Sequence, residues 1–374
     1  MNILITGDFF ISDDYKNNGL INQSVISLFD EVDYRIVNLE GPITANEPKN
    51  KILKTGPHLR MSENTAFQYL NQLKVDAVTL ANNHILDYGG QGLFDTIELL
   101  KQNHVAHVGA GNNLGEANKP LTLENDGLRI AILNFCENEW SIAEEDKPGA
   151  NPLDIIDNTN QIKTAKATHD KVICIIHGGH EYYHLPSPRM QKQYRFYADN
   201  GADAIVGHHT HCIGGFEIYN DVPIIYSLGN FLFTKTSNNP EWYYGLVVML
   251  RVSQYSPISF DLAHINSSSE SFQIFNKKNA EKEAFIGNLN QSITNSEKLK
   301  NDWENYTLNR SSGVIKILSP EKLIKNKYIR VLFRKFIFEK YYDNQFLKII
   351  HNQFRCEAHY DLTKNSLKML NEKN

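Results

Sequence analysis

Short apolar runs alternate with segments in which apolar residues recur at helical spacing over the first two thirds of the chain. The runs predict strands at about 2–6, 35–39, 76–80, 104–108, 120–124, 128–135, 172–176, 203–206, 216–219, 223–228 and 244–252. The segments between them predict helices at about 20–31, 62–73, 89–102, 157–169 and 189–200. Strands that alternate with helices predict an α/β fold.

Polar residues follow five of the predicted strands directly. In open α/β sheets, ligands bind at the carboxyl ends of the strands, so these residues predict one site at one edge. Any one of them alone is equally well an ordinary turn residue or a solvated side chain, but five at the same edge make chance the weaker explanation. They are Asp8, Glu40, Asn82-Asn83-His84, His177 and Gly207-His208-His209-Thr210-His211.

The last of these blocks is the richest in histidine. On an extended turn, His209 and His211 point the same way and can reach one centre. A set of carboxylate, amide and imidazole ligands suits Mn, Fe, Zn or Mg better than copper or an iron–sulfur cluster. For the turn alone, a solvated loop rich in histidine is the alternative interpretation.

Composition is that of an ordinary globular protein, with 41% hydrophobic and 22% charged residues among 374. Residues 1–270 carry 19 basic against 32 acidic side chains (−13), whereas residues 271–374 carry 19 against 11 (+8). This asymmetry and the serine-rich segment 266–271 predict two parts, 1–265 and 266–374. The four cysteines have no disulfide or zinc spacing.

No apolar stretch is long enough for a signal peptide or a spanning helix, which predicts a cytoplasmic location. The second part is expected to be basic and mainly helical, with helices at about 280–306 and 320–355. Its basic, aromatic-rich segment is typical of a helix that contacts an anionic membrane surface or a partner. We favour the alternative that it packs on the acidic first part, and no motif indicates nucleic-acid binding.

Six blocks in order resemble the CapA-type family of capsule or poly-γ-glutamate synthesis proteins, which looks like a bacterial branch of the calcineurin-like metallophosphatase superfamily. The resemblance spans residues 1–265 and implies a sandwich of two mixed sheets flanked by helices. The blocks are Asp8, Asn38-Leu39-Glu40-Gly41, the run 81–89, His177-Gly178-Gly179-His180-Glu181, the run 207–211 and Tyr226-Ser227-Leu228-Gly229-Asn230-Phe231.

The resemblance also implies a binuclear site for two divalent ions, namely Mn, Fe, Zn or Mg. Glu40 is then the bridging carboxylate, and the other ligands are Asp8, Asn83, His177, His209 and His211. His84 and Asp87 match the family's histidine–acid pair beside the metals. His84 could protonate the leaving oxygen or stabilise charge on the transferred group, and Asp87 would orient it and raise its pKa. For that pair alone, a helix-cap contact is the alternative. Candidate substrate-binding residues are Asn38, His180, Glu181, Arg189, His208 and Asn230.

One departure concerns Phe10, which stands where the wider superfamily has a histidine two positions after the first aspartate. The first metal position therefore lacks one ligand or takes it from elsewhere. His180, Glu181 and His208 are the nearest candidates.

The sequence thus predicts a metal-dependent hydrolase of a phosphoester or related bond in capsule or cell-surface polymer biosynthesis. Its partners would be an anionic polymer or phosphoester substrate, and a polymer synthase or the membrane surface contacted through the basic tail. The alternative is a non-catalytic accessory protein that binds a polymer or a membrane synthase through the same fold. A nucleotide phosphatase or nuclease is a weaker third option.

Overall fold

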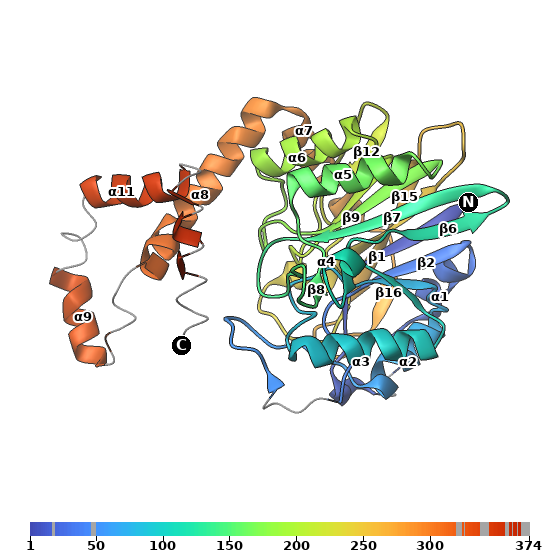
Figure 1. Ribbon diagram of the computed structural model, residues 1–374, viewed down its shortest axis with the longest axis horizontal. Coiled ribbons are helices and arrows are strands. Elements are labelled where there is room, and N and C mark those ends of the chain that lie inside the picture. Colours follow the sequence, from blue (N-terminus) through green and yellow to red (C-terminus); the bar gives the residue numbers. More distant parts are fainter. Residues whose placement is uncertain are drawn as a thin grey trace. The chain divides into compact units, whose positions relative to one another are not determined.

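The computed structural model describes residues 1–16, 19–45, 50–318, 324, 326–336, 344–355, 359–360, 362–364 and 366–367. Two mixed β-sheets pack face to face, and helices cover the outer face of each sheet (Figure 1). The predicted α/β sandwich of two mixed sheets flanked by helices is therefore confirmed.

The first sheet has eight strands, in the order β16-β15-β14-β1-β2-β3-β4, with β13 paired to β1 beside this path. Strands β1 to β4 and β13 run parallel, whereas β14, β15 and β16 continue the sheet in antiparallel fashion. The bounds are β1 Asn2–Phe10, β2 Tyr34–Leu39, β3 Ala77–Thr79, β4 Ala106–Val108, β13 Asn230–Phe233, β14 Tyr244–Arg251, β15 Ser259–Ser267 and β16 Ile274–Asn276.

The second sheet has six strands, in the order β11-β12-β10-β9-β7-β6. Its central strands β12, β10, β9 and β7 are parallel, and the edge strands β11 and β6 are antiparallel to their neighbours. The bounds are β6 Leu121–Asn125, β7 Leu128–Cys136, β9 Lys171–His177, β10 Ala204–His208, β11 Phe216–Tyr219 and β12 Val222–Ile225. A small separate sheet pairs β5 Ala110–Gly111 with β8 Gly149–Ala150.

Successive side chains of the central strands enter different hydrophobic clusters. Ile3 and Ile5 of β1 pack between the two sheets, whereas Leu4 packs against the helices on the outer face. On β9, Ile173 lies in the cluster between the sheets and Cys174 in the cluster beneath the other helices. Since successive side chains point to opposite faces of a strand, a strand covered on both faces must be apolar throughout.

Helices lie on the outer face of both sheets (Figure 1). On the first sheet they are α1 Gln23–Asp30, α2 Glu63–Gln72 and α3 Gly89–Gln102, and on the second α5 Ile155–Lys166 and α6 Pro188–Asp199. The described residues of this region also form the short helix α4 Leu114–Ala117 and 3₁₀ turns at Asp13–Tyr15 and Pro240–Tyr243.

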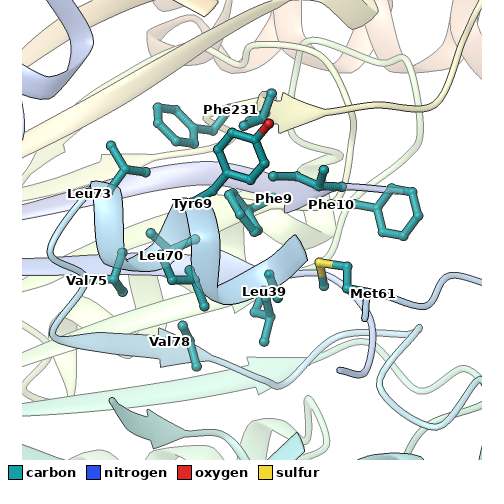
Figure 2. Close-up of a cluster of buried hydrophobic side chains, with 14 of the residues drawn as sticks. Phe9, Phe10, Leu39, Met61, Tyr69, Leu70, Leu73, Val75, Val78 and Phe231 are labelled. Atoms are coloured by element: carbon teal, nitrogen blue, oxygen red, sulfur yellow. The ribbon is translucent and has the colours of Figure 1, made fainter. Parts of the chain in front are cut away.

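Helix α2 shows how a covering helix is held. The Ser62 side chain accepts a hydrogen bond from the backbone amide of Thr65 and caps the first turn, as the sequence predicts. The buried Tyr69 hydroxyl donates to the carbonyl of Tyr15 at 2.8 Å. Below the helix, its apolar face meets three strands of the first sheet (Figure 2). The side chains in this layer are Phe9, Leu39, Tyr69, Leu70, Leu73 and Val78.

Strands β13, β15 and β16 are absent from the sequence prediction. Strand β13 is a four-residue strand, and β16 has three residues, so neither contains a periodic pattern of useful length. Strand β15 has no regular alternation of buried and exposed residues along its whole length. Each of the three depends on pairing with another strand: β13 pairs with β1, which is distant along the chain, and β15 pairs with β14 and β16.

By its contacts the chain divides into residues Met1–Trp303 and Glu304–Asn374, later than the predicted boundary at 265/266. The segment predicted as a linker begins within β15 and is followed by β16, which pairs with β15. Helix α7, Ala280–Thr294, contacts β11 of the second sheet. Pairing and packing therefore keep residues 266–303 with the first unit.

The described residues of the second unit lie mostly in helices, in agreement with the predicted helical C-terminal part. Its helices include the last part of α8 Ser296–Leu318, then α9 Lys327–Phe336 and α11 Asn344–Arg355. Residues 320–323, 325 and 337–343 of the predicted basic helix, and Cys356, lie outside the described residues. Among the described residues, no helix has both the length and the apolar composition needed to cross a membrane.

Candidate metal centre

The polar residues predicted from the strand ends come together at one edge of the sandwich. Asp8 lies near the end of β1, and Glu40 follows β2. His177 is the last residue of β9 and pairs in register with His208, the last residue of β10. Both sheets therefore deliver side chains to the same place.

Glu40 is the most unusual of these residues. Its side chain is fully buried, and neither carboxylate oxygen has a hydrogen-bond partner among the described residues. One of its oxygens lies within 4.8 Å of donor atoms of both Asp8 and His177. Burial raises the pKa of Glu40 well above its ordinary value; the charge of His211 opposes this shift, and the charges of Asp8, Glu181 and Asp87 add to it. A buried carboxylate with two free oxygens is costly unless a cation compensates it.

Asp8 lies next to Glu40 and is held from several sides. The Asn38 side-chain amide donates to Asp8 Oδ1 at 2.7 Å, and the backbone amide of His209 donates to Oδ2 at 3.3 Å. His211 Nδ1 lies 3.4 Å from Oδ2. Burial opposes ionisation of Asp8, but the hydrogen bond from His211 and the charge of that ring hold the pKa of Asp8 below the usual range.

His177, His209 and Asn83 form a compact group of donor atoms. His177 Nε2 lies 3.1 Å from Asn83 Oδ1 and 3.2 Å from His209 Nδ1. Burial first, and then the neighbouring His209, lower the pKa of His177 well below its usual value, so the ring is neutral. Neutral imidazole and amide oxygen are the forms in which these side chains bind a cation.

The histidine turn is not extended, contrary to the sequence prediction. His209 has φ 88° and His211 has φ 53°, so both lie in the left-handed region that non-glycine residues seldom occupy. Their rings are nevertheless near each other, with centroids 6.3 Å apart. The Tyr182 backbone amide donates to the Thr210 carbonyl at 2.8 Å and fixes the turn. Strain of this kind concentrates at functional sites.

The close approach of strands behind the turn requires glycine at one position. A Cβ at Gly207 would lie 2.2 Å from the carbonyl oxygen of Tyr226. The backbone that leads into the histidine turn therefore packs directly against the backbone at Tyr226.

His84 and Asp87 form the predicted pair, and a third residue joins them. His84 Nδ1 lies 2.7 Å from Asp87 Oδ2, and its Nε2 lies 3.7 Å from Glu40 Oε1. The ammonium of Lys54 forms an ion pair with Asp87 and lies 3.0 Å from His84 Nδ1. Burial lowers the pKa of His84 despite the opposing effect of Asp87. The Leu59 backbone amide also donates to Asp87, at 2.7 Å, so the carboxylate is fixed from both sides.

The position of the missing histidine is filled by packing. Phe10 is 6% exposed, and its ring centroid lies 5.2 Å from that of Phe233. Of the three replacement candidates, His208 is fully buried, contacts the Thr6 carbonyl at 2.7 Å through Nε2 and leaves Nδ1 without a partner among the described residues.

The other two replacement candidates lie nearer the surface. His180 packs against the ring of Trp303, with centroids 4.7 Å apart. Glu181 is exposed and lines a cavity beside the metal-ligand candidates. Among the described residues, neither of these two joins the buried cluster of Asp8, Glu40 and His177.

Three further residues predicted to bind substrate have other contacts. Asn38 is buried and orients Asp8, while its oxygen accepts from Thr79 at 2.9 Å. Asn230 lies 2.9 Å from His211 Nδ1 and orients that ring. Arg189 is 66% exposed and contacts Gln193 on its own helix.

Sequence reasoning did not identify several residues at this edge. Lys54 and Lys235 lie in non-periodic segments, and Trp242 lies in a 3₁₀ turn. Glu139 accepts a hydrogen bond from the Asn83 amide at 3.0 Å, which fixes Asn83 with its oxygen toward His177. No motif or spacing in the sequence indicates these contacts.

The donor set fits divalent metal ions. Asp8, Glu40 and His177 already lie close enough together to bind one cation, and Asn83, His209 and His211 surround them. Mixed carboxylate, amide and imidazole donors are borderline in hardness and suit Mn, Fe, Zn or Mg. The unpaired oxygens of Glu40 provide the acceptor that such an ion would satisfy.

Fold and site together define an α/β sandwich with a carboxylate–histidine cluster at its strand ends. Residues 2–235 match the family model described as bacterial capsule synthesis protein PGA_cap, so the chain belongs to this family.

Three curated relatives are similar to the chain. Capsule biosynthesis protein CapA of Bacillus anthracis is 33% identical over 60% of this chain and 59% of its own. PGA biosynthesis protein CapA of Bacillus subtilis (strain 168) is 36% identical over 59% and 58%. A probable polyglutamine synthesis accessory protein of Mycobacterium tuberculosis is 29% identical over 53% and 55%. The chain thus spans less than two thirds of each relative's length.

Similarities to solved structures are more remote. A hypothetical protein from Thermus thermophilus has a TM-score of 0.45 at 15% identity, covering 72% of this chain and 100% of that one. A phosphatase from Mycoplasma pneumoniae has a TM-score of 0.42 at 13% identity, covering 74% and 90%.

Proposed function

We propose that this protein is a metal-dependent hydrolase of a phosphoester or a related bond in capsule, poly-γ-glutamate or other cell-surface polymer biosynthesis. The observation that carries the proposal is Glu40, a fully buried carboxylate with both oxygens unpaired among the described residues. It lies beside Asp8 and His177, and all three offer donor atoms within 4.8 Å of one another. A purely structural cluster would instead pair its buried carboxylates with hydrogen-bond donors.

Two divalent ions are proposed as cofactors. Glu40 would bridge them, and the remaining ligands would be Asp8, Asn83, His177, His209 and His211. When bound, such ions polarise a phosphoryl oxygen and make water a better nucleophile at neutral pH. Phe10 leaves one side of the cluster without an imidazole, and His208 is the buried replacement candidate that retains a free nitrogen among the described residues.

His84, in its protonated form, is proposed to deliver the Nε2 proton to the leaving oxygen. Its Nε2 faces Glu40 at 3.7 Å, while Nδ1 is held by Asp87 at 2.7 Å. Because Asp87 also binds Lys54 and the Leu59 amide, the imidazole cannot rotate away without breaking several contacts. General acids held in this way typically contribute about 10²–10⁴ in rate.

The experiment combines metal analysis with turnover. Wild-type protein is expected to purify with, or take up, a divalent transition metal and to hydrolyse a generic phosphoester. Glu40→Gln and His209→Ala should lower metal affinity by about tenfold or more, in line with the effect of removing metal-supporting residues. Glu63→Gln, an exposed carboxylate at the start of α2, is the matched control and should change neither quantity. The proposal would be wrong if the wild-type protein bound no metal and Glu40→Gln left the rate of phosphoester hydrolysis unchanged.

The pathway assignment is supported by the family and by the names of the relatives. The chain belongs to a capsule synthesis family, and two relatives are named for capsule or PGA biosynthesis. We propose that this chain acts on an anionic polymer or a phosphoester precursor, in the cytoplasm, and in association with a polymer synthase. Co-purification of a synthase from the native cells tests the partner.

A second candidate function is that of a non-catalytic accessory protein. Phe10 favours it, since the first metal position lacks an imidazole there and is closed by the Phe10–Phe233 contact. The printed name of the mycobacterial relative also describes an accessory role. A protein that binds polymer equally well as wild type and as His84→Ala, and never turns over a phosphoester, would establish this function instead.

A further inference from the structure

The histidine turn depends on support from neighbouring segments, because its backbone is strained. His209 and His211 both have positive φ angles, and such a conformation persists only where the surrounding structure fixes it. Part of the support comes from Gly207, which packs against the backbone at Tyr226. Any other segment that is bonded to this turn also helps to keep the two imidazoles in place.

The segment 178–184, which follows β9, provides a second support. The Tyr182 backbone amide donates to the Thr210 carbonyl at 2.8 Å, in the middle of the turn. His184 Nδ1 lies 2.7 Å from the carbonyl oxygen of Ile213, just after the turn. The segment therefore holds the histidine turn both at its middle and at its end.

Aromatic side chains of α7 and α8 hold this segment in turn. The Trp303 ring of α8 lies 4.7 Å from the ring of His180 and 5.8 Å from that of Tyr183, measured between centroids. On α7, the Phe285 ring meets the ring of His184 edge-on at 4.9 Å. Packed rings in such arrangements contribute stability beyond the area that they bury. Trp303 thus contacts the same segment that bonds the histidine turn.

The two helices that carry these rings are themselves fixed to the first unit. The Gln191 side-chain amide of α6 donates to the carbonyl of Ile293 at 2.7 Å, and Ile293 is fully buried. On α8, Leu299 is 1% exposed, one turn before Trp303. Trp303 is the last residue of the first unit and lies beyond residues 2–235, which match the family model. The fold therefore places this ring through contacts that lie outside the family match.

We infer that Trp303 is a positioning residue of the proposed metal centre, which acts through the segment 178–184 on the turn that carries His209 and His211. The inference rests on the proposed function and adds to it a support from α8. Without the Trp303 ring, the segment loses its contact with α8, and the hydrogen bond from Tyr182 to the turn opens more often. The two imidazoles then spend less time in the geometry that binds a metal ion.

The test measures Mn²⁺ affinity by titration calorimetry, and hydrogen exchange of residues 178–184 and 207–211 in the metal-free state, on full-length protein. Trp303→Ala should weaken Mn²⁺ binding about tenfold, as when outer partners of metal ligands are removed, and should speed exchange in both segments. Trp303→Phe keeps a ring at this position and should bind Mn²⁺ nearly as tightly as wild type. Leu100→Ala, which removes a buried side chain near the end of α3, should lower stability but change neither quantity.

The two measurements separate the inference from the proposed function. If wild type binds Mn²⁺ and Trp303→Ala changes neither affinity nor exchange, the inference is wrong while the metal centre stands. An equal loss of affinity in Trp303→Phe or in Leu100→Ala would also overturn it, because the effect would then not depend on the ring contact. If wild type binds no Mn²⁺, the proposed function fails, and exchange alone decides: faster exchange confined to Trp303→Ala supports the positioning role, and unchanged exchange overturns it.

Discussion

Glu40 has opposite effects on the stability of the metal-free protein and on metal binding. Burial raises its pKa above the ordinary 4.5, so above that pH the folded protein binds more protons than the unfolded chain. Glu40 therefore lowers stability increasingly as the pH rises. A divalent cation, however, needs this ionised and unpaired carboxylate as a ligand.

We predict that Glu40→Gln stabilises the metal-free protein by about 1–3 kcal/mol at pH 8, and by less at pH 5. Thermal melts in EDTA at the two pH values measure this. Added Mn²⁺ should raise the melting temperature of wild type but not of Glu40→Gln, because binding to the folded state alone stabilises it. Equal melting temperatures for both proteins at pH 8 in EDTA would show that the Glu40 carboxylate has a compensating partner in the metal-free protein.

Lys54 leads to a second prediction at the scale of single residues. Its side chain is 2% exposed, and that of its partner Asp87 is fully buried. Lys54→Met should destabilise the protein by about 3–5 kcal/mol, since removing one member of a buried ion pair leaves the other charge uncompensated. Urea denaturation measures the change.

The chain offers a matched control for this substitution. Lys74 and Asp30 also form an ion pair, but their side chains are 65% and 43% exposed. Lys74→Met should therefore cost about 1 kcal/mol or less. If both substitutions had the same small effect, the Lys54–Asp87 contact would not be a buried pair in solution.

The sequence predicted the residues that follow strands and missed those that arrive from loops. Asp8, Glu40 and His177 could be found because each comes directly after an apolar run that ends at the same edge. Lys54 and Lys235 could not, because their positions depend on how irregular segments fold back over the site. The side chains that form the centre were thus more predictable than those that surround it.

At the scale of elements, α2 illustrates the energetic role of a covering helix. Leu70 is 1% exposed and lies in the layer between α2 and the first sheet (Figure 2). Leu70→Ala should cost about 2–5 kcal/mol, since the surrounding side chains close such a cavity only in part. Chemical denaturation measures the loss, and Gln72→Ala, an exposed position on the same helix, should be nearly neutral. A small effect for Leu70→Ala would mean that the layer repacks.

Element prediction succeeded where the pattern was local and failed where partners were distant. The central strands and the five covering helices follow from periodicity, because each is buried along one face or both. Strands β13 and β16 are too short for any pattern and exist through pairing with β1 and β15. The prediction that the histidine turn is extended was wrong, because His209 and His211 adopt positive φ angles that the sequence alone did not indicate.

At the scale of the whole molecule, charge and apolar exposure differ between the two units. Residues 304–374, the second unit, carry 14 basic against 7 acidic side chains. Within the second unit, four large apolar side chains of α9 are 54–69% exposed. They alternate along the helix sequence with lysine and arginine residues. The four apolar residues are Tyr328, Ile329, Val331 and Leu332. Basic amphipathic helices of this kind lie in the interface of anionic membranes.

We therefore predict that the full-length protein binds vesicles containing anionic phosphatidylglycerol and that binding weakens as salt is raised, because surface charges are then screened. Leu332→Glu should reduce co-sedimentation about tenfold, whereas Ile218→Glu, an equally exposed apolar position on β11, should not. Binding that is equal for neutral phosphatidylcholine vesicles would contradict the electrostatic part of this argument. A helix that contacts another protein instead of lipid would leave co-sedimentation at background for wild type and both variants.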